Sequence, residues 1–120
     1  MLDIIDIKID NAVAFKMSGR ITENDMSVVL AESRFKSERF KKIVIYEEIE
    51  SFSGIDFSAI AEEIKYLYKV GISNIDKVAV VADKGWIEKI VKIEDKLFSN
   101  IHIKYFKSDE KDEAIRFLKE

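Results

Sequence analysis

Serine and carboxylate side chains gather in the segment from Glu47 to Ile60. Serine hydroxyls beside a helix start suit phosphate binding or phosphorylation, because the first N–H groups of a helix are free and carry its positive dipole end. Ser53 and Ser58 are therefore the candidate regulatory residues. Each nearby carboxylate repels an anion by about 1–4 kcal/mol at ~4 Å, whereas the dipole attracts it by only about 0.3–1 kcal/mol. Three carboxylates oppose an anion here, which favours simple helix capping: Glu48, Glu50 and Asp56.

Apolar side chains in this segment and in a later one indicate another kind of site. Ligands of open α/β sheets bind beside the carboxyl ends of the strands, where Phe52 and Trp86 are both expected. The sequence thus predicts a cleft for an apolar, lipid-like small molecule between the second and third helices. Its lining residues are Phe52, Phe57, Ile60, Trp86 and Ile90. The same residue types at helical spacing are also typical of a hydrophobic core or a homodimer face, and that alternative stays open.

The sequence shows no recognisable group of metal-binding residues and no catalytic nucleophile with a partner base. The chain has no cysteine and one histidine, His102, which we expect at the surface or at the rim of a site. The acidic run Glu47-Glu48-Glu50 lacks the regular spacing and turn glycine of a calcium loop, so we interpret it as a solvated loop. No serine has a histidine near it in sequence. We therefore expect no metal, no catalytic residue and no enzyme activity.

One basic cluster stands out in a chain of net charge −3: Arg34, Lys36, Arg39, Lys41 and Lys42. Cations complement the negative dipole end of a helix, so a solvated helix end is the favoured interpretation. An anionic membrane surface or an acidic partner is the alternative, at about 1 kcal/mol per charge near the surface. The overall acidity disfavours nucleic acid as the main partner.

Size and composition predict one domain over residues 1–120, because 120 residues with 48% hydrophobic side chains can bury a full core. No run approaches the ~20 apolar residues that a membrane span needs. The acidic, alternating start after Met1 is unlike a signal peptide, so we expect a cytoplasmic protein.

Hydrophobic periodicity predicts the order ββαβαβαβα. Two half-buried strands, carrying Ile5–Ile9 and Val13–Met17, are expected to join at Asp10-Asn11. A helix capped by Thr22 with Asp25 should end near Glu38. The later elements are a buried strand at 43–46, a loop, a helix from Asp56 to Gly71, a strand at 78–82, a helix at 84–98, an edge strand at 101–105 and a last helix capped by Ser108 or Asp109.

This order implies a mainly parallel sheet with right-handed crossovers, made mixed by the opening hairpin. The fold class is therefore a single-domain α/β sandwich with a five-stranded mixed sheet and four helices.

Four local signatures, spread over nearly the whole chain, resemble the SpoIIAA-like family. These signatures are Ser18-Gly19-Arg20-Ile21-Thr22 with Asp25, Phe52-Ser53-Gly54, Lys77–Asp83 with Trp86, and Glu113–Leu118. The family is related to STAS domains and anti-sigma-factor antagonists, and is also grouped with the lipid-binding CRAL-TRIO domains.

The resemblance implies a binding or regulatory module without a cofactor. In the phospho-regulated antagonists the switch is a serine in an Asp-Ser-Ser-Gly type sequence, at the start of the helix after the third strand. This chain has Asp56-Phe57-Ser58-Ala59 there, which departs from the pattern at two positions. The resemblance thus leaves two functions: recognition of an apolar small molecule, or contact with a protein partner through residues 50–58.

Overall fold

The computed structural model describes residues 1–19, 22–51, 74–83, 85, 87 and 102–120. Its centre is one five-stranded sheet in the order β1-β2-β3-β4-β5. The strands are β1 (Leu2–Ile4), β2 (Ala12–Ser18), β3 (Ile43–Ser51), β4 (Ile75–Val81) and β5 (His102–Phe106). β1 runs antiparallel to β2, and the remaining neighbours are parallel. The predicted mixed sheet is confirmed.

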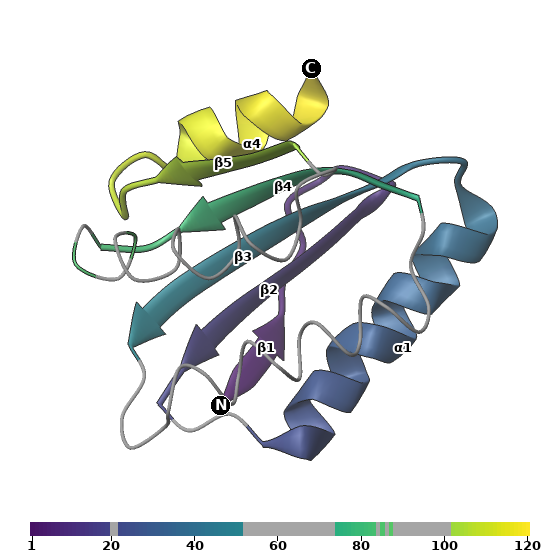
Figure 1. Cartoon of the computed structure of the whole chain (residues 1–120), viewed down its shortest axis with the longest axis horizontal. Coiled ribbons are helices and arrows are strands. Elements are labelled where there is room, and N and C mark those ends of the chain that lie inside the picture. Colours follow the sequence, from purple (N-terminus) through teal and green to yellow (C-terminus); the bar gives the residue numbers. More distant parts are fainter. Residues whose placement is uncertain (20–21, 52–73, 84, 86, 88–101) are drawn as a thin grey trace.

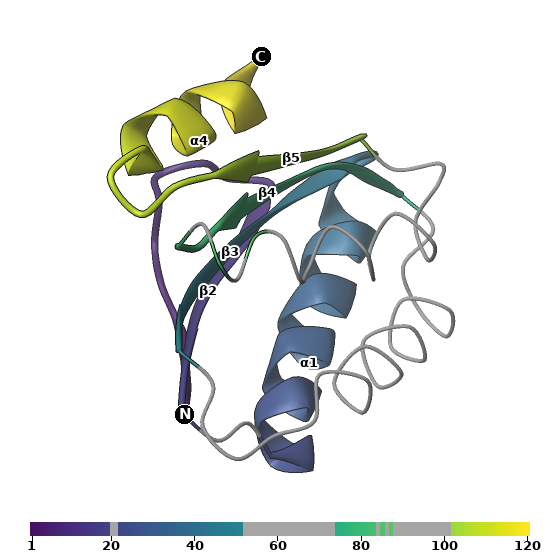
Figure 2. The same cartoon turned by 60° about the vertical axis from the view of Figure 1, so that its left-hand side comes forward.

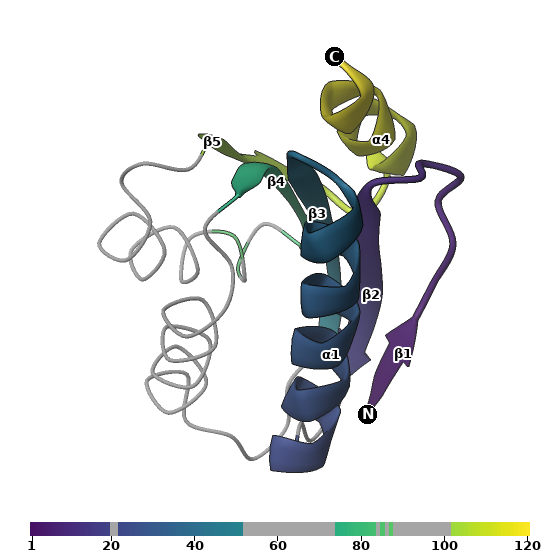
Figure 3. The same cartoon turned by 90° about the vertical axis from the view of Figure 1, so that its right-hand side faces the viewer.

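Two helices cover opposite faces of this sheet (Figures 1 and 3). α1 (Glu23–Arg39) connects β2 to its neighbour β3, and α4 (Lys111–Lys119) follows the last strand. Figure 2 shows α1 and α4 on either side of the strands. The described part of the chain therefore contains two of the four predicted helices. The predicted helix from Asp56 to Gly71 lies outside the described residues, and so does the predicted helix at 84–98 except for Gly85 and Ile87, which are helical.

The sheet has an α1 face and an α4 face, and each carries a buried apolar cluster. The α1 face presents alternate residues of the central strands, including Phe15, Ile45 and Val80. The α4 face presents the intervening residues, including Tyr46 and Ala79, against Ala114, Phe117 and Leu118 of α4. β2 is therefore buried on both faces, and the prediction that it is half-buried is wrong, because Ala12 and Ala14 are small enough to lie beneath neighbouring side chains.

α1 begins where the sequence predicts, after the N-cap residue Thr22. The Thr22 hydroxyl accepts from the Asp25 N–H at 3.1 Å, and the Asp25 carboxylate accepts from the Thr22 N–H at 2.9 Å. This capping box satisfies two amide groups that a helix start leaves free. The bond from the Thr22 N–H also lowers the pKa of Asp25. Met26, Val29 and Ser33, which recur at helical spacing, form the buried side of α1.

Ser33 yields a stability prediction, because its side chain is 0% exposed and its hydroxyl has no hydrogen-bond partner in the described structure. Ser33→Ala removes this desolvated hydroxyl and adds a better helix former, so the free energy of unfolding should rise by about 1 kcal/mol. Urea denaturation measures the change. Ser27→Ala, at an exposed position where the hydroxyl donates to Glu23 O, is the matched control and should gain less. A loss of stability in Ser33→Ala contradicts the prediction.

The first strand differs from its prediction. β1 pairs Leu2, Asp3 and Ile4 with β2, whereas the predicted strand at Ile5–Ile9 is wrong. Lys8 has a left-handed φ of 63°, and its N–H donates to Asp6 Oδ1 at 2.8 Å. This local turn directs the chain away from the ladder, because a strand cannot continue through a left-handed residue.

The C-terminal elements are largely as predicted. β5 lies at the sheet edge, and the buried residues of α4 are Ala114, Phe117 and Leu118. The predicted caps Ser108 and Asp109 are wrong, because the N-cap is Glu110, which makes no side-chain capping bond. Its carboxylate accepts instead from the Lys107 N–H at 2.8 Å and closes the preceding turn.

Candidate functional site

β3 extends much further than its sequence indicates. The acidic run interpreted as a solvated loop continues the strand to Ser51, so that interpretation is wrong. Glu47 and Glu48 are only 3% and 7% exposed, on opposite faces of the sheet. Burial of two adjacent carboxylates is uncommon, since a buried charge needs partners that replace its hydration. These carboxylates are the functional candidates that sequence reasoning missed.

The Glu48 carboxylate on the α4 face has three partners from three elements. It accepts a hydrogen bond from the Tyr46 hydroxyl at 2.9 Å. Lys111 Nζ, at the start of α4, lies 3.3 Å from Glu48 Oε1. Lys16 Nζ, on β2, lies 3.7 Å from Glu48 Oε2 and 2.8 Å from Glu50 Oε1. We call these five residues the Glu48 cluster.

Strand register explains why the Glu48 cluster forms here. Lys16 and Glu48 are direct partners across the parallel pair β2–β3, so their side chains share the α4 face. Tyr46 lies two residues before Glu48 and therefore points to the same side. The cluster lies toward the carboxyl ends of β2 and β3, the edge at which α/β sheets usually bind ligands.

Burial sets the electrostatics of the cluster. Desolvation, reinforced by the hydrogen bond to Glu48, raises the pKa of Tyr46 well above its ordinary value, so its hydroxyl stays a neutral donor at physiological pH. The hydrogen bond to Glu50 raises the pKa of Lys16. The negative charges of Glu48 and Glu50 are balanced by the positive charges of Lys16 and Lys111. The arrangement suits a rigid link between β2, β3 and α4 better than proton transfer.

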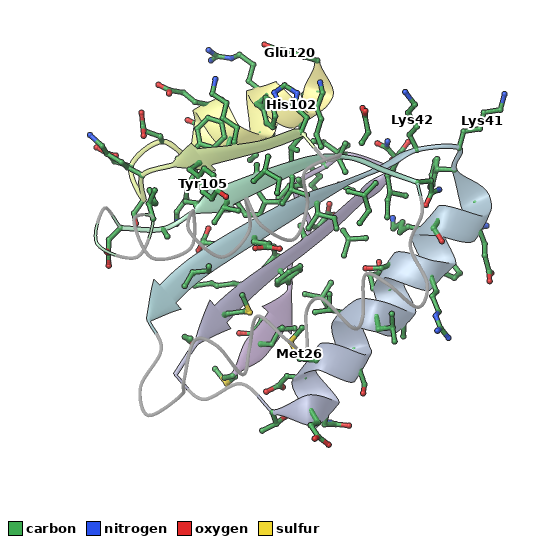
Figure 4. The ribbon with its side chains drawn as sticks, in the orientation of Figure 1. Met26, Lys41, Lys42, His102, Tyr105 and Glu120 are labelled. Carbon is green, nitrogen blue, oxygen red and sulfur yellow. The ribbon has the colours of Figure 1, made fainter. Side chains whose placement is uncertain are left out.

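His102 lies far from these groups along the sheet. It begins β5 and pairs in register with Lys77 near the start of β4, whereas Glu48 pairs with Val81 at the other end of that strand. His102 is exposed, as predicted, and Figure 4 shows it beside α4. Its ring meets the Phe117 ring edge-on at 5.2 Å. The described residues contain no group of three or more potential metal ligands.

A surface pocket of about 540 Å³ lies beside β2. Its walls come from the segment 4–10, from Ala12 and Ala14, and from Glu32 and Lys36 of α1. Ile4, which lines it, is 42% exposed. The Lys36 ammonium donates to Asp10 O at 2.8 Å and ties the segment to α1. The lining residues that the structure describes come from segments 4–14 and 32–36, which hold none of the residues predicted for the cleft.

All seven sequence-predicted site residues lie outside the described structure: Phe52, Ser53, Phe57, Ser58, Ile60, Trp86 and Ile90. The structure does describe how the chain approaches them. β3 and β4 are parallel neighbours, so the chain leaves both at the same edge of the sheet. Ile87 packs against the α1 face, and its N–H donates to Asp83 O at 2.9 Å, in agreement with the start of the predicted helix at 84–98.

The family model described as SpoIIAA-like matches residues 12–119. The chain belongs to the SpoIIAA-like family. Comparison with curated proteins returns no match, and comparison with solved structures returns none either. The matched region contains β2 to β5 and both described helices, together with the whole Glu48 cluster.

Membership in the SpoIIAA-like family makes the chain a STAS-type binding or regulatory module. Domains of this kind are generally non-enzymatic and often interact with partner proteins. No described helix is long and apolar enough to cross a membrane.

Proposed function

We propose that residues 1–120 form one cytoplasmic, non-catalytic domain that recognises an apolar, lipid-like small molecule beside the carboxyl ends of β3 and β4. One observation carries this proposal: these parallel neighbours end at one edge, where apolar side chains surround the buried Glu47 on their α1 face. Ile49, Val80 and Ala82 form that part of the face, with exposures of 0–4%. The segments holding the predicted ligand residues begin directly after these strands.

The chemistry of those segments supports an apolar ligand. Five side chains offer aromatic and aliphatic surface: Phe52, Phe57, Ile60, Trp86 and Ile90. Ligand pockets are mostly lined by such groups, with few polar ones for orientation. The Glu48 cluster contributes on the other face of the sheet, where it links β3 to β2 and α4 and so keeps the shared edge rigid.

Native mass spectrometry of gently purified protein tests this proposal. We expect a mass above that of the bare chain, and a shift of Trp86 fluorescence on titration with a fatty acid, since Trp86 is the single tryptophan. Phe52→Ala and Phe57→Ala should each weaken binding about tenfold, the effect of removing a buried phenylalanine. Val28→Ala, at an exposed position of α1, is the control and should leave binding unchanged. A bare mass together with unchanged fluorescence contradicts the proposal.

A protein-interaction module of the antagonist type is the second candidate. Glu50, with its side chain 53% exposed, begins the segment 50–58 at the carboxyl edge and is open to a partner. A pull-down from the native host should recover a specific protein. Phe57→Asp and Ser58→Asp should each abolish recovery, whereas Ser108→Asp, in the exposed turn before α4, should not. Recovery unaffected by both changes counts against this candidate.

A further inference from the structure

The outer side of α1 exposes large apolar side chains. Val28 and Phe35 are 45% and 51% exposed, and their spacing of seven residues places them on one side of the helix. Phe40, at the end of the same helix, packs instead against the α1 face of the sheet. Phe35 is therefore an apolar group that the fold leaves in contact with water.

Cations surround Phe35 at the end of α1. Residues 32–42 contain five basic and two acidic side chains, a local net charge of +3 in a chain of net charge −3. Within the described structure, no carboxylate lies at ion-pair distance from Arg34, Arg39 or Lys41. The Arg39 guanidinium lies 4.8 Å from the centre of the Phe35 ring. Lys41 and Lys42 project away from the fold (Figure 4).

We propose that this end of α1 docks on an anionic lipid surface. Phe35 enters the headgroup region, and Arg34, Arg39 and Lys41 face the lipid phosphates. Each cation near such a surface strengthens binding about fivefold, and an interfacial aromatic adds to that. The outer side of a helix is convex, so it fits a deformable lipid interface without needing a groove that receives Phe35.

The carboxylates nearby weaken this attraction without reversing it. Glu32 and Glu38 lie on the same helix, and Asp76 lies 4.0 Å from Lys42. After Glu32 and Glu38 are counted, the segment remains positive. Lys36 donates to Asp10 O and is oriented by that bond, so it is left out of the test below. This surface is independent of the ligand site proposed above, since none of its residues belongs to that site.

Vesicle co-sedimentation tests the docking surface. The full chain should bind vesicles of phosphatidylcholine mixed with phosphatidylglycerol, should not bind pure phosphatidylcholine, and should be released by salt. The triple variant Arg34→Gln, Arg39→Gln, Lys41→Gln should bind roughly a hundredfold more weakly, at about fivefold per cation. Phe35→Ala should weaken binding several-fold, because the interfacial aromatic is lost.

The matched control is the triple variant Lys107→Gln, Arg116→Gln, Lys119→Gln, which removes the same charge at and around α4. These positions are exposed and lie in α4 or just before it, and Figure 3 shows α4 on the opposite side of the sheet from α1. Binding that survives in this control but is lost in the α1 variant supports the proposal. Equal loss in both overturns it, as does failure of the unmodified chain to bind. A change in oligomeric state in Phe35→Ala, measured by light scattering, makes the surface a subunit interface and also overturns it.

Discussion

Replacing Glu48 by alanine is expected to lower the free energy of unfolding by about 3 kcal/mol. The substitution leaves the Tyr46 hydroxyl without its acceptor in a residue that is 2% exposed, which costs about 1–3 kcal/mol. Lost packing at the buried Glu48 position adds to this. Lys16 and Lys111 have side chains 35% and 50% exposed, so water replaces much of what they lose. Urea denaturation followed by circular dichroism measures the change.

Two further variants separate the hydrogen bond from the charge. Glu48→Gln keeps an oxygen that accepts from Tyr46 and should cost only about 1 kcal/mol. Glu50→Ala removes a carboxylate whose side chain is 53% exposed and should cost at most about 0.5 kcal/mol. Equal losses in Glu48→Ala and Glu50→Ala would show that the buried carboxylate has no special role.

Local sequence signals were sufficient where local forces decide the structure. Thr22 and Asp25 predicted the start of α1, because a capping box needs only four consecutive residues. The apolar runs likewise located β3 and β4, and the hairpin at the start predicted a mixed sheet. Thr22 and Asp25 also end the first signature of the family resemblance, and the family assignment is confirmed.

The end of β3 was missed because its stabilising partners are distant in sequence. Two adjacent glutamates look like a solvated loop, and nothing near them shows that Lys16 and Lys111 neutralise Glu48. Ile49 was the available signal, since it continues the period of two set by Ile43 and Ile45. The Glu48 cluster therefore depends on tertiary structure that no local pattern encodes.

The prediction of the first strand failed for a local reason instead. Alternating isoleucines fit a strand at Ile5–Ile9, but the bond from Lys8 N–H to Asp6 Oδ1 bends the chain there. The isoleucines still contribute, because Ile5, Ile7 and Ile9 pack against the apolar cluster of the α4 face. Hydrophobic alternation thus identified which side chains are partly buried without identifying the backbone that carries them.

Tyr46 is expected to make the protein strongly sensitive to alkaline pH. Its pKa is raised above the ordinary value of 10.0, chiefly by desolvation and then by the bond to Glu48. Above pH 10 the unfolded chain releases this proton while the folded chain retains it. The contribution of Tyr46 to stability is therefore complete below pH 10 and is lost as pH rises toward the folded pKa, by up to about 1.4 kcal/mol per pH unit.

Tyr46→Phe isolates this effect, because the other three tyrosines remain in both proteins. At neutral pH the variant should be about 1 kcal/mol less stable, having lost the hydrogen bond to Glu48. Urea denaturation at increasing pH measures the free energy of unfolding of both proteins. The two curves should cross at about pH 11, because the variant has no hydroxyl at position 46 to ionise on unfolding. Parallel curves would mean that Tyr46 ionises equally in both states. In that case burial and the hydrogen bond to Glu48 do not raise the pKa of the Tyr46 hydroxyl in the folded chain.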